Sequence, residues 1–228
     1  MHGLYAIADA EVLEAYGIDV LGFAAAVLSA PLAALQLRAK DVSARQTLTL
    51  LRELAPMCRR AGVPLVANDR PDLAVLAGCD LVHVGQDDMP IDRVRRIAPG
   101  LRVGVSTHTF EQLGAALDAR PAYVAFGPVF ATSSKKDPAP VVGVDALRVA
   151  HARARVAGIP LVAIGGITLD RAASIADDAE AVAVISALLP PPLAADRARP
   201  AAERLGEVAA RARDLAGVFA RALRPIAS

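Results

Sequence analysis

The fold is decided by the stretch Phe126-Gly127-Pro128-Val129-Phe130-Ala131-Thr132-Ser133-Ser134-Lys135. An apolar run stops there at a Gly-Pro pair, and hydroxyl and lysine side chains follow within a few positions. This order predicts a buried strand that delivers a polar loop to solvent. Backbone N–H groups, hydroxyls and the Lys135 ammonium can hold phosphate oxygens. Because the same order of apolar run and polar loop recurs along the chain, we interpret this loop as one of a ring.

Short runs rich in branched aliphatic residues occur repeatedly. Most lack the strict alternation of apolar and polar residues that a strand with one solvent-exposed face shows. The runs are Leu4–Ala8, Leu32–Leu37, Pro64–Ala67, Leu81–Val84, Leu101–Val105, Tyr123–Phe126, Pro160–Ile164 and Ala181–Ile185. Helix-like segments separate them. The candidates are Val42–Gly62, with Gly62 as its terminator, and Leu73–Ala77, Ile91–Ala98, Phe110–Ala119, Val144–Ala157 and Leu169–Asp177.

This alternation predicts an α/β fold in which a parallel sheet closes into a (β/α)8 TIM barrel. A doubly wound open sheet is the alternative, and the number of repeats in 228 residues favours the barrel. We expect residues 1–228 to form a single domain, in which 200–228 supplies one or two closing helices.

Composition narrows the class of protein. The formal net charge is +1, which does not suggest a nucleic-acid partner. The two cysteines, Cys58 and Cys79, lack CxxC spacing and argue against a disulfide framework or zinc site. The stretch Ile18–Leu37 is apolar, but Asp19 and Pro31 interrupt it, and the start of the chain does not read as a signal peptide. We therefore expect a cytoplasmic protein without a membrane span.

A barrel places its functional side chains at the carboxyl ends of its strands. Three groups follow those ends: the cations Arg38, Lys40 and Lys135, the carboxylates Asp69 and Asp88, and the segments Gly165-Gly166 and Ile185-Ser186. Carboxylates beside phosphate-binding cations suit Mg²⁺. The segments Gly165-Gly166 and Ile185-Ser186 follow the last two predicted strands, where barrels commonly bind a phosphomonoester. The ring therefore has room for a Mg²⁺-polyphosphate and a separate monophosphate.

Each of these interpretations has a simpler alternative. Arg38 and Lys40 can belong to a solvated loop, Asp69 can be a helix N-cap, and Gly165-Gly166 can be a tight turn. Spacing does not decide between Asp87 and Asp88 as the metal ligand.

The candidate histidines and nucleophiles also have a simpler interpretation. His83 lies inside a strand and is expected to pack rather than react, whereas His108 lies at the rim. No Cys or Ser stands in a nucleophile constellation. That favours a reaction in which pyrophosphate leaves, a step that needs a metal and cations more than a protein base.

Several motifs together identify a family. They are Leu4-Tyr5 with Asp9, Gln36-Leu37-Arg38-Ala39-Lys40, Asn68-Asp69, His83-Val84-Gly85-Gln86-Asp87-Asp88, Gly104-Val105-Ser106, the Phe126–Lys135 loop, Gly165-Gly166-Ile167 and Ile185-Ser186-Ala187. In order and spacing the chain resembles thiamine phosphate synthase over nearly its full length. The resemblance implies a transferase that joins hydroxymethylpyrimidine pyrophosphate to thiazole phosphate by a dissociative, Mg²⁺-assisted substitution, with loss of pyrophosphate.

The resemblance also implies a role for individual residues. Gln36 would hold the pyrimidine, Ser106 would touch the pyrimidine or the pyrophosphate, and Asp69 and Asp88 would hold Mg²⁺. The pyrophosphate would be held by Arg38, Lys40, Asn68 and Lys135. The thiazole phosphate would be held by Thr132, Ser134, Gly166, Ile185 and Ser186. The residues expected to act on the reacting groups are Arg38, Lys40, Ser106 and Lys135.

Two departures and two alternatives accompany the resemblance. The family usually has Thr where this chain has Ser134, and segment 11–29 matches poorly. A thiazole tautomerase on the same fold would not need the full set of cations and carboxylates. A non-catalytic phosphate-binding barrel would not need the metal carboxylates. The partners implied are small molecules, and an oligomer is compatible with the sequence.

Overall fold

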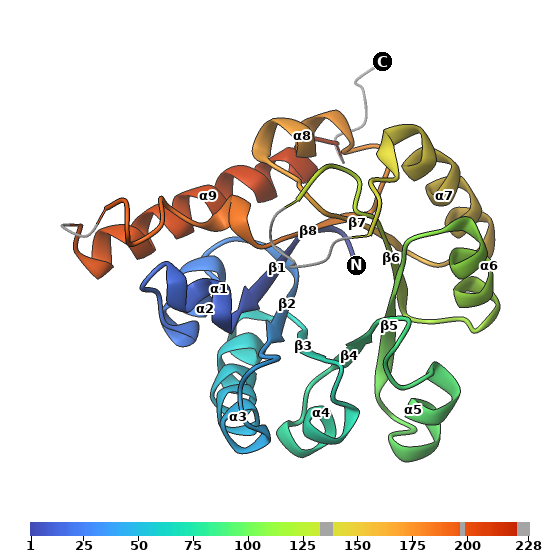
Figure 1. Cartoon of the computed structure of the whole chain (residues 1–228), viewed down its shortest axis with the longest axis horizontal. Helices are drawn as coiled ribbons and strands as arrows, with labels where there is room; N and C mark the ends of the chain where they lie inside the picture. Colours follow the sequence, from blue (N-terminus) through green and yellow to red (C-terminus); the bar gives the residue numbers. More distant parts are fainter. Residues whose placement is uncertain (133–138, 197–198, 223–228) are drawn as a thin grey trace.

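The computed structural model of the chain describes residues 1–132, 139–196 and 199–222. Eight parallel strands close into a barrel in the order of the sequence, and helices surround them (Figure 1). The predicted (β/α)8 barrel is therefore confirmed, and the open sheet is excluded.

All the apolar runs form strands. Their bounds are β1 Gly3–Asp9, β2 Leu32–Arg38, β3 Leu65–Asn68, β4 Leu81–Val84, β5 Arg102–Thr107, β6 Tyr123–Phe126, β7 Leu161–Ile164 and β8 Ala181–Val184. Pairing between β1 and β8, from Gly3 opposite Ala181 to Ala6 opposite Val184, closes the ring.

Each predicted helical segment contains a helix, with differences at the ends. Their bounds are α1 Ala10–Ala15, α2 Val20–Val27, α3 Ala44–Ala61, α4 Pro71–Ala77, α5 Ile91–Ile97, α6 Phe110–Asp118, α7 Gly143–Ala157, α8 Leu169–Ser174, the 3₁₀ turn η1 Ser186–Leu188, and α9 Ala201–Ala222. The sequence did not predict α1, which the buried Asp9 carboxylate caps by accepting from the backbone N–H of Val12.

Local capping explains several boundaries. Ser43 accepts a hydrogen bond from the backbone of Gln46 and starts α3, and Gly62, with a φ of 66°, ends it as predicted. The N-cap of α4 is Arg70, with Pro71 in the first turn, so the alternative role of Asp69 as a helix cap is wrong. Helix α8 ends at Ser174 rather than at the predicted Asp177.

Two hydrophobic clusters make up the core. The larger lies between the strands and the helices and includes Leu35, Leu54 and Leu113, while the smaller lies inside the barrel around Tyr5, Tyr123 and other residues. This division follows from the alternation of side chains along each strand. Position 5 therefore points into the barrel, and position 4 points toward the helices.

The chain after β8 continues through η1 to a single long helix. Helix α9 packs against α2, α8 and β1, and in Figure 1 it runs along the outside of the barrel beside α1 and α2. Residues 223–228, which the sequence assigned to the closing segment, lie outside the described part of the chain.

Within the described residues, no helix is both long and apolar enough to cross a membrane. Cys58 is buried, Cys79 is half-buried, and both are free thiols. Burial raises the pKa of Cys58 to about 11 and that of Cys79 to about 12. Both thiols are therefore expected to stay protonated at neutral pH.

A glycine makes room for one of the two tyrosine side chains in the barrel interior. Gly104 on β5 pairs with His83 on β4 and with Tyr123 on β6. A Cβ atom at Gly104 would lie 2.1 Å from the Tyr123 ring carbon Cζ. The missing side chain is therefore what allows the Tyr123 phenol to cross β5 and reach His83.

We expect Gly104→Ala to lower the free energy of unfolding by about 1–3 kcal/mol, because the fully buried ring must move in a close-packed interior. Urea denaturation followed by circular dichroism measures this change. The control is Gly114→Ala in α6, where an added Cβ meets no atom within 4 Å. Equal stabilities of the two variants would contradict this account of the interior.

Candidate active site

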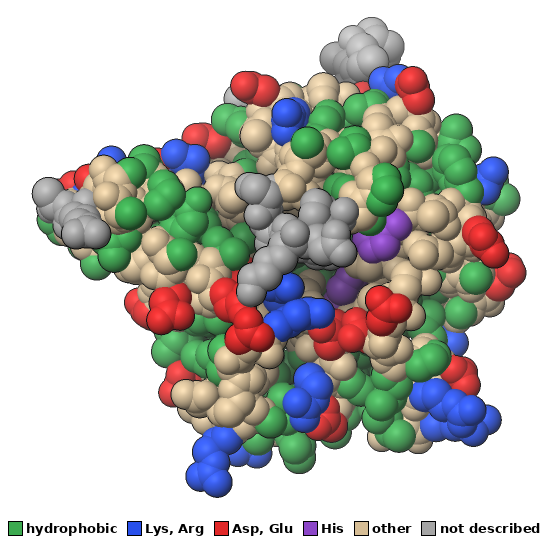
Figure 2. All heavy atoms as spheres, in the orientation of Figure 1, with side chains coloured by type: hydrophobic (Ala, Val, Ile, Leu, Met, Phe, Trp, Pro, Cys, Tyr) green, Lys and Arg blue, Asp and Glu red, His purple; other side chains and the backbone are tan. Residues whose placement is uncertain are grey.

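The carboxyl ends of the strands surround a hollow with two adjoining compartments. The first, of about 580 Å³, lies over the ends of β6, β7 and β8, and we name it the β6–β8 compartment. The second, of about 510 Å³, reaches into the barrel among β2 to β5, and we name it the β2–β5 compartment. Lys40, Ser106 and His108 line both. In Figure 2, acidic and basic side chains gather around this hollow, with histidine at its edge.

Two loops pack backbone against backbone in the β6–β8 compartment. The N–H of Val129 donates to the carbonyl of Ile164 (2.9 Å), and the N–H of Phe130 donates to the carbonyl of Gly165 (3.0 Å). A Cβ atom at Gly166 would lie 2.2 Å from the carbonyl oxygen of Ala131. The glycines therefore do more than make a tight turn, because they let the loop after β6 lie directly on the end of β7.

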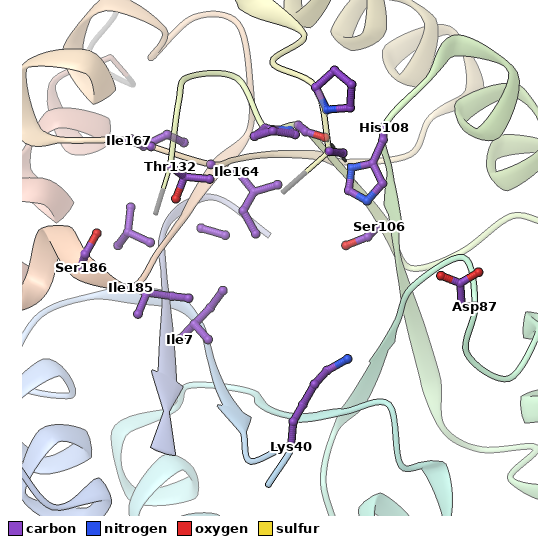
Figure 3. A pocket seen from close by; sticks show the side chains of 18 residues that line it. Ile7, Lys40, Asp87, Ser106, His108, Thr132, Ile164, Ile167, Ile185 and Ser186 are labelled. Atoms are coloured by element: carbon purple, nitrogen blue, oxygen red, sulfur yellow. Dashed lines mark hydrogen bonds between the residues drawn. The ribbon is translucent and has the colours of Figure 1, made fainter. Parts of the chain in front are cut away.

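The predicted thiazole-phosphate residues come together in this compartment. Thr132, Gly166, Ile185 and Ser186 all line it. In Figure 3, Thr132 and Ser186 lie across the hollow from Asp87 and Lys40. Of the remaining predicted residues, Ser134 and Lys135 lie outside the described part of the chain.

Arg171 holds these two loops together and was missed by the sequence analysis. Its Nη1 atom donates to the carbonyl of Gly166 (2.6 Å), and its guanidinium lies over the ring of Phe130, 4.8 Å from the centroid. Cation–π contacts of this kind are favourable but modest at exposed sites. An Arg after a Gly-Gly turn has too many surface roles for the sequence to have singled it out.

A pair of carboxylates lies at the mouth of the β2–β5 compartment. Asp69 follows β3 with a left-handed backbone (φ 61°), and its Oδ2 lies 3.2 Å from the Lys40 ammonium. The Oδ2 of Asp88 accepts the backbone N–H of Gly85 at 2.8 Å. Asp87 is exposed at the edge of both compartments, whereas Asp88 is half-buried and turned toward Asp69.

The proximity of these carboxylates changes the proton affinity of Asp69. Burial raises the pKa of Asp69, and the hydrogen bond and charge repulsion from Asp88 raise it further, while Lys40 acts in the opposite direction. Two close carboxylates with one lysine leave negative charge only partly compensated. This donor set fits a divalent cation such as Mg²⁺, which takes one or two protein carboxylates and fills its other positions with water and phosphate oxygens.

The two predicted cations at the β2 end are held differently. The Nη1 of Arg38 donates to the Oδ2 of the buried Asp9 at 2.5 Å, so Arg38 is fixed by an ion pair rather than free in a solvated loop. Lys40 reaches Asp69 from a more exposed position and lines both compartments. Figure 3 shows its side chain extending into the hollow.

The remaining predicted residues are joined inside the barrel. Gln36 Nε2 donates to Asn68 Oδ1 at 2.6 Å, and the Ser106 hydroxyl lies 2.7 Å from His83 Nε2. Tyr5 and Tyr123 connect these two pairs, and the sequence analysis gave neither tyrosine a role. The inward face of the strands, read at every second residue, could have indicated them.

Two further polar side chains shape the rim. His108 Nδ1 lies 2.5 Å from the carbonyl of Gly127, an oxygen that can only accept, so the Nδ1 atom carries the proton. Gln86 donates to the carbonyl of Ser106 at 2.6 Å and supports the end of β5.

The sequence and the fold of this chain are both similar to those of known proteins. The family profile described as "Thiamine monophosphate synthase" matches residues 4–188. The chain is 48% identical over 168 residues to the thiamine-phosphate synthase of Roseiflexus sp. (strain RS-1), covering 72% of this chain and 70% of that one. It is 44% identical over 196 residues to that of Koribacter versatilis (strain Ellin345), covering 83% and 90%. The solved thiamine phosphate pyrophosphorylase of Pyrococcus furiosus is similar at a TM-score of 0.80, with 27% identity and 97% of each chain covered.

The raised pKa of Asp69 predicts a pH dependence of stability in metal-free protein. The folded state holds this proton more tightly than the unfolded chain, whose Asp pKa is about 3.9. The stabilisation is complete below about pH 4 and is lost as pH rises through the higher folded pKa. In EDTA, wild type should therefore lose stability relative to Asp69→Asn as pH rises from about 4 to 7.

Urea unfolding at several pH values measures this difference. Asp87→Asn is the control, because its side chain is exposed at the same rim, and this variant should follow wild type. A wild-type curve parallel to that of Asp69→Asn over the whole range would show that the carboxylate pair does not interact as described.

Proposed function

The chain belongs to the thiamine monophosphate synthase family, and on this premise we propose that it joins hydroxymethylpyrimidine pyrophosphate to thiazole phosphate with release of pyrophosphate. In this substitution the bond between the pyrimidine methylene carbon and a pyrophosphate oxygen breaks, and a bond from that carbon to the thiazole nitrogen forms. Pyrophosphate leaves with the electron pair of the broken bond, so no protein nucleophile is required.

The observation that carries the proposal is the division of the hollow. Carboxylates and cations border the β2–β5 compartment, whereas glycines and hydroxyls line the β6–β8 compartment beyond the shared Lys40 and Asp87. The two meet at Ser106, His108 and Lys40. A polyphosphate held at one side and a monophosphate held at the other would leave the two organic rings facing each other at the junction.

The pyrophosphate would lie between Arg38, Lys40 and the carboxylate pair. The Asp9 carboxylate fixes the Arg38 guanidinium before any ligand binds, which lowers the cost of ordering that side chain. Asp69 and Asp88 would hold Mg²⁺, which when bound stabilises the negative charge that builds on the leaving group. Lys40, next to Asp69, would then be released toward a phosphate oxygen.

The monophosphate would lie over Gly166 and beside Ser186 and Thr132. Glycine backbone can approach a phosphate closely because it carries no side chain. Ile185 would pack against the thiazole ring at the junction of the compartments. The sequence resemblance supports Ser134 and Lys135 as further ligands of the two phosphates, and both remain proposals for residues outside the described part of the chain.

Charge separation at the reacting carbon favours a dissociative course. A carbocation between a departing pyrophosphate and an incoming nitrogen is protected only if water is kept away from it. Ile7 and Ile164 line both compartments where they meet and supply apolar surface there. The cytoplasmic location and the possibility of an oligomer stay predictions from the sequence.

The proposal is tested by incubating the protein with both substrates and Mg²⁺ and measuring pyrophosphate release and the joined product. Both should appear in equal amounts, and neither should appear when one substrate is omitted. Isomerisation of a thiazole without pyrophosphate release would favour a tautomerase, and binding of both phosphates without turnover would favour a non-catalytic barrel.

Asp88→Asn should lower kcat/KM by at least about 30-fold, because a bound metal supplies several kcal/mol of charge stabilisation and about 2 kcal/mol is a conservative share. Steady-state assays over a range of Mg²⁺ concentrations measure this loss. Asp87→Asn, a matched substitution at the exposed neighbour, should stay within about threefold of wild type on the same scale. Equal losses from both variants would show that the choice of Asp88 as the ligand is wrong.

Ser186→Asp should raise the KM for thiazole phosphate by about tenfold or more, since like charges placed together in a binding site cost several kcal/mol. The affinity for the pyrimidine pyrophosphate, measured by calorimetry with Mg²⁺, should stay nearly unchanged. Ser186→Asn has the same shape without the charge and serves as the control. Loss of pyrimidine pyrophosphate binding in Ser186→Asp alone would contradict two separate subsites.

A further inference from the structure

Six polar side chains form one continuous chain of hydrogen bonds across the interior of the barrel. They come from six strands and line the β2–β5 compartment: Asn68, Gln36, Tyr5, Tyr123, His83 and Ser106. Gln36 Nε2 lies 2.6 Å from Asn68 Oδ1, and the Tyr5 hydroxyl lies 2.7 Å from Gln36 Oε1. The two tyrosine hydroxyls are 2.8 Å apart.

His83 completes the chain. Its Nδ1 lies 2.7 Å from the Tyr123 hydroxyl, and its Nε2 lies 2.7 Å from the Ser106 hydroxyl. His83 also stacks on the Tyr123 ring, with an interplanar angle of 17° and ring centroids 5.6 Å apart. The imidazole is therefore fixed by two hydrogen bonds and a stacking contact.

The direction of each bond follows from the first one. Tyr5 donates its only proton to Gln36 Oε1, so its oxygen must accept the proton of Tyr123. Since Tyr123 has then used its proton, it must accept from His83 Nδ1–H. Burial raises the pKa of both tyrosines, so each hydroxyl keeps its proton at neutral pH.

The same reasoning assigns the donor and acceptor roles at the two ends of this chain of hydrogen bonds. When the imidazole is neutral, a proton on Nδ1 leaves a lone pair on Nε2, and Ser106 then donates its hydroxyl proton to His83. The Ser106 oxygen is left with lone pairs only. At the other end, Asn68 uses its oxygen to accept from Gln36, which leaves its amide N–H groups for other partners.

We infer that Tyr5, His83 and Tyr123 are positioning residues that orient this chain in one direction, so that Ser106 faces the cavity as a hydrogen-bond acceptor and Asn68 and Gln36 offer amide N–H donors. A ligand ring that fits must carry an N–H donor toward β5 and an acceptor toward β2 and β3. An aminopyrimidine has this pattern, with an amino group on one edge and ring nitrogens elsewhere. Only this choice of ligand rests on the proposed function.

An oxopyrimidine reverses the pattern, because its carbonyl oxygen replaces the amino donor. It would bring an acceptor against the acceptor-only oxygen of Ser106, and buried polar groups without a partner are costly. The direction of these hydrogen bonds would thus favour the amino ring over the oxo ring.

The direct test is the tautomer of His83 in the ligand-free protein, read from ¹⁵N chemical shifts of labelled histidine at about pH 8. The protein contains four histidines, and the His83→Gln variant identifies the signals of His83. The inference requires the proton on Nδ1. A proton on Nε2 would mean that the whole chain runs the other way and that Ser106 is a donor, which would overturn it.

Tyr123→Phe tests the consequence for binding, since it removes the hydroxyl that links the two halves of the chain. We expect the KM for the pyrimidine pyrophosphate to rise about tenfold, the loss of roughly one buried hydrogen bond, and the KM for thiazole phosphate to change less than twofold. The preference for the amino over the oxo analogue, measured by calorimetry, should fall about tenfold because Ser106 can then turn its proton toward the cavity.

Tyr16→Phe is the matched control, because Tyr16 is the only tyrosine outside the chain of hydrogen bonds. It should change neither KM nor the preference for the amino ring. An unchanged preference in Tyr123→Phe would overturn the inference, and if that variant fails to fold, the His83 tautomer in wild type still decides. If His83 carries its proton on Nδ1 but the wild type releases no pyrophosphate, the proposed function fails and the direction of the chain stands.

Discussion

The hydrogen bonds between β1 and β8 close the sheet, and the other features of the molecule depend on that closure. A closed parallel barrel turns every second side chain inward, where no helix can cover it. Toward the amino ends of the strands these positions are filled by apolar residues such as Ala181, Leu81 and Val162. Toward the carboxyl ends several of these positions are polar, and each buried polar group then needs a hydrogen-bond partner.

That requirement gives the site its rigidity. Tyr5 and Tyr123 are too long for a barrel lined evenly with large side chains, and Gly104 supplies the missing space. Their hydroxyls then link side chains from strands on different sides of the ring, so the groups that face the cavity are fixed by packing rather than by loop conformation. Sites supported in this way hold ligands in a defined orientation at low entropic cost.

The two compartments differ in the charge of the groups that line them. Burial raises the pKa of Asp69, and the neighbouring Asp88 raises it further by a hydrogen bond and by charge repulsion. A divalent cation with a polyphosphate would convert this repulsion into attraction. The β6–β8 compartment, in contrast, uses glycine backbone and hydroxyls, and Arg171 ties its two loops together from outside. An ionic site beside a largely neutral one can sort two phosphorylated ligands that differ in charge.

The sequence predicts the barrel well because eight apolar runs with turn residues between them leave few other arrangements. It also places Asp69, Asp88 and Gly166 at one rim, since parallel strands end together. It does not predict helix α1, whose six residues are too few to show a helical period.

The sequence also does not predict the contacts among the inward side chains. His83, interpreted as a packing residue, is indeed buried. Its hydrogen bonds to Tyr123 and Ser106 depend on β-strand register, as does the path of Tyr123 across Gly104. The pairing of Asp9 with Arg38 likewise arises from the register of β1 and β2, in which the two residues lie opposite each other. Register and closure bring such groups together, and a single sequence specifies neither directly.

The central claim is that one hollow holds two phosphorylated ligands at separate ends. A crystal structure of the protein with Mg²⁺, pyrophosphate and thiamine phosphate tests it most directly. The account predicts pyrophosphate and metal at Arg38, Lys40, Asp69 and Asp88, the monophosphate over Gly166 and Ser186, and the joined rings between them near Ser106. Both phosphate groups at one end of the hollow, or a metal away from Asp69 and Asp88, would contradict it.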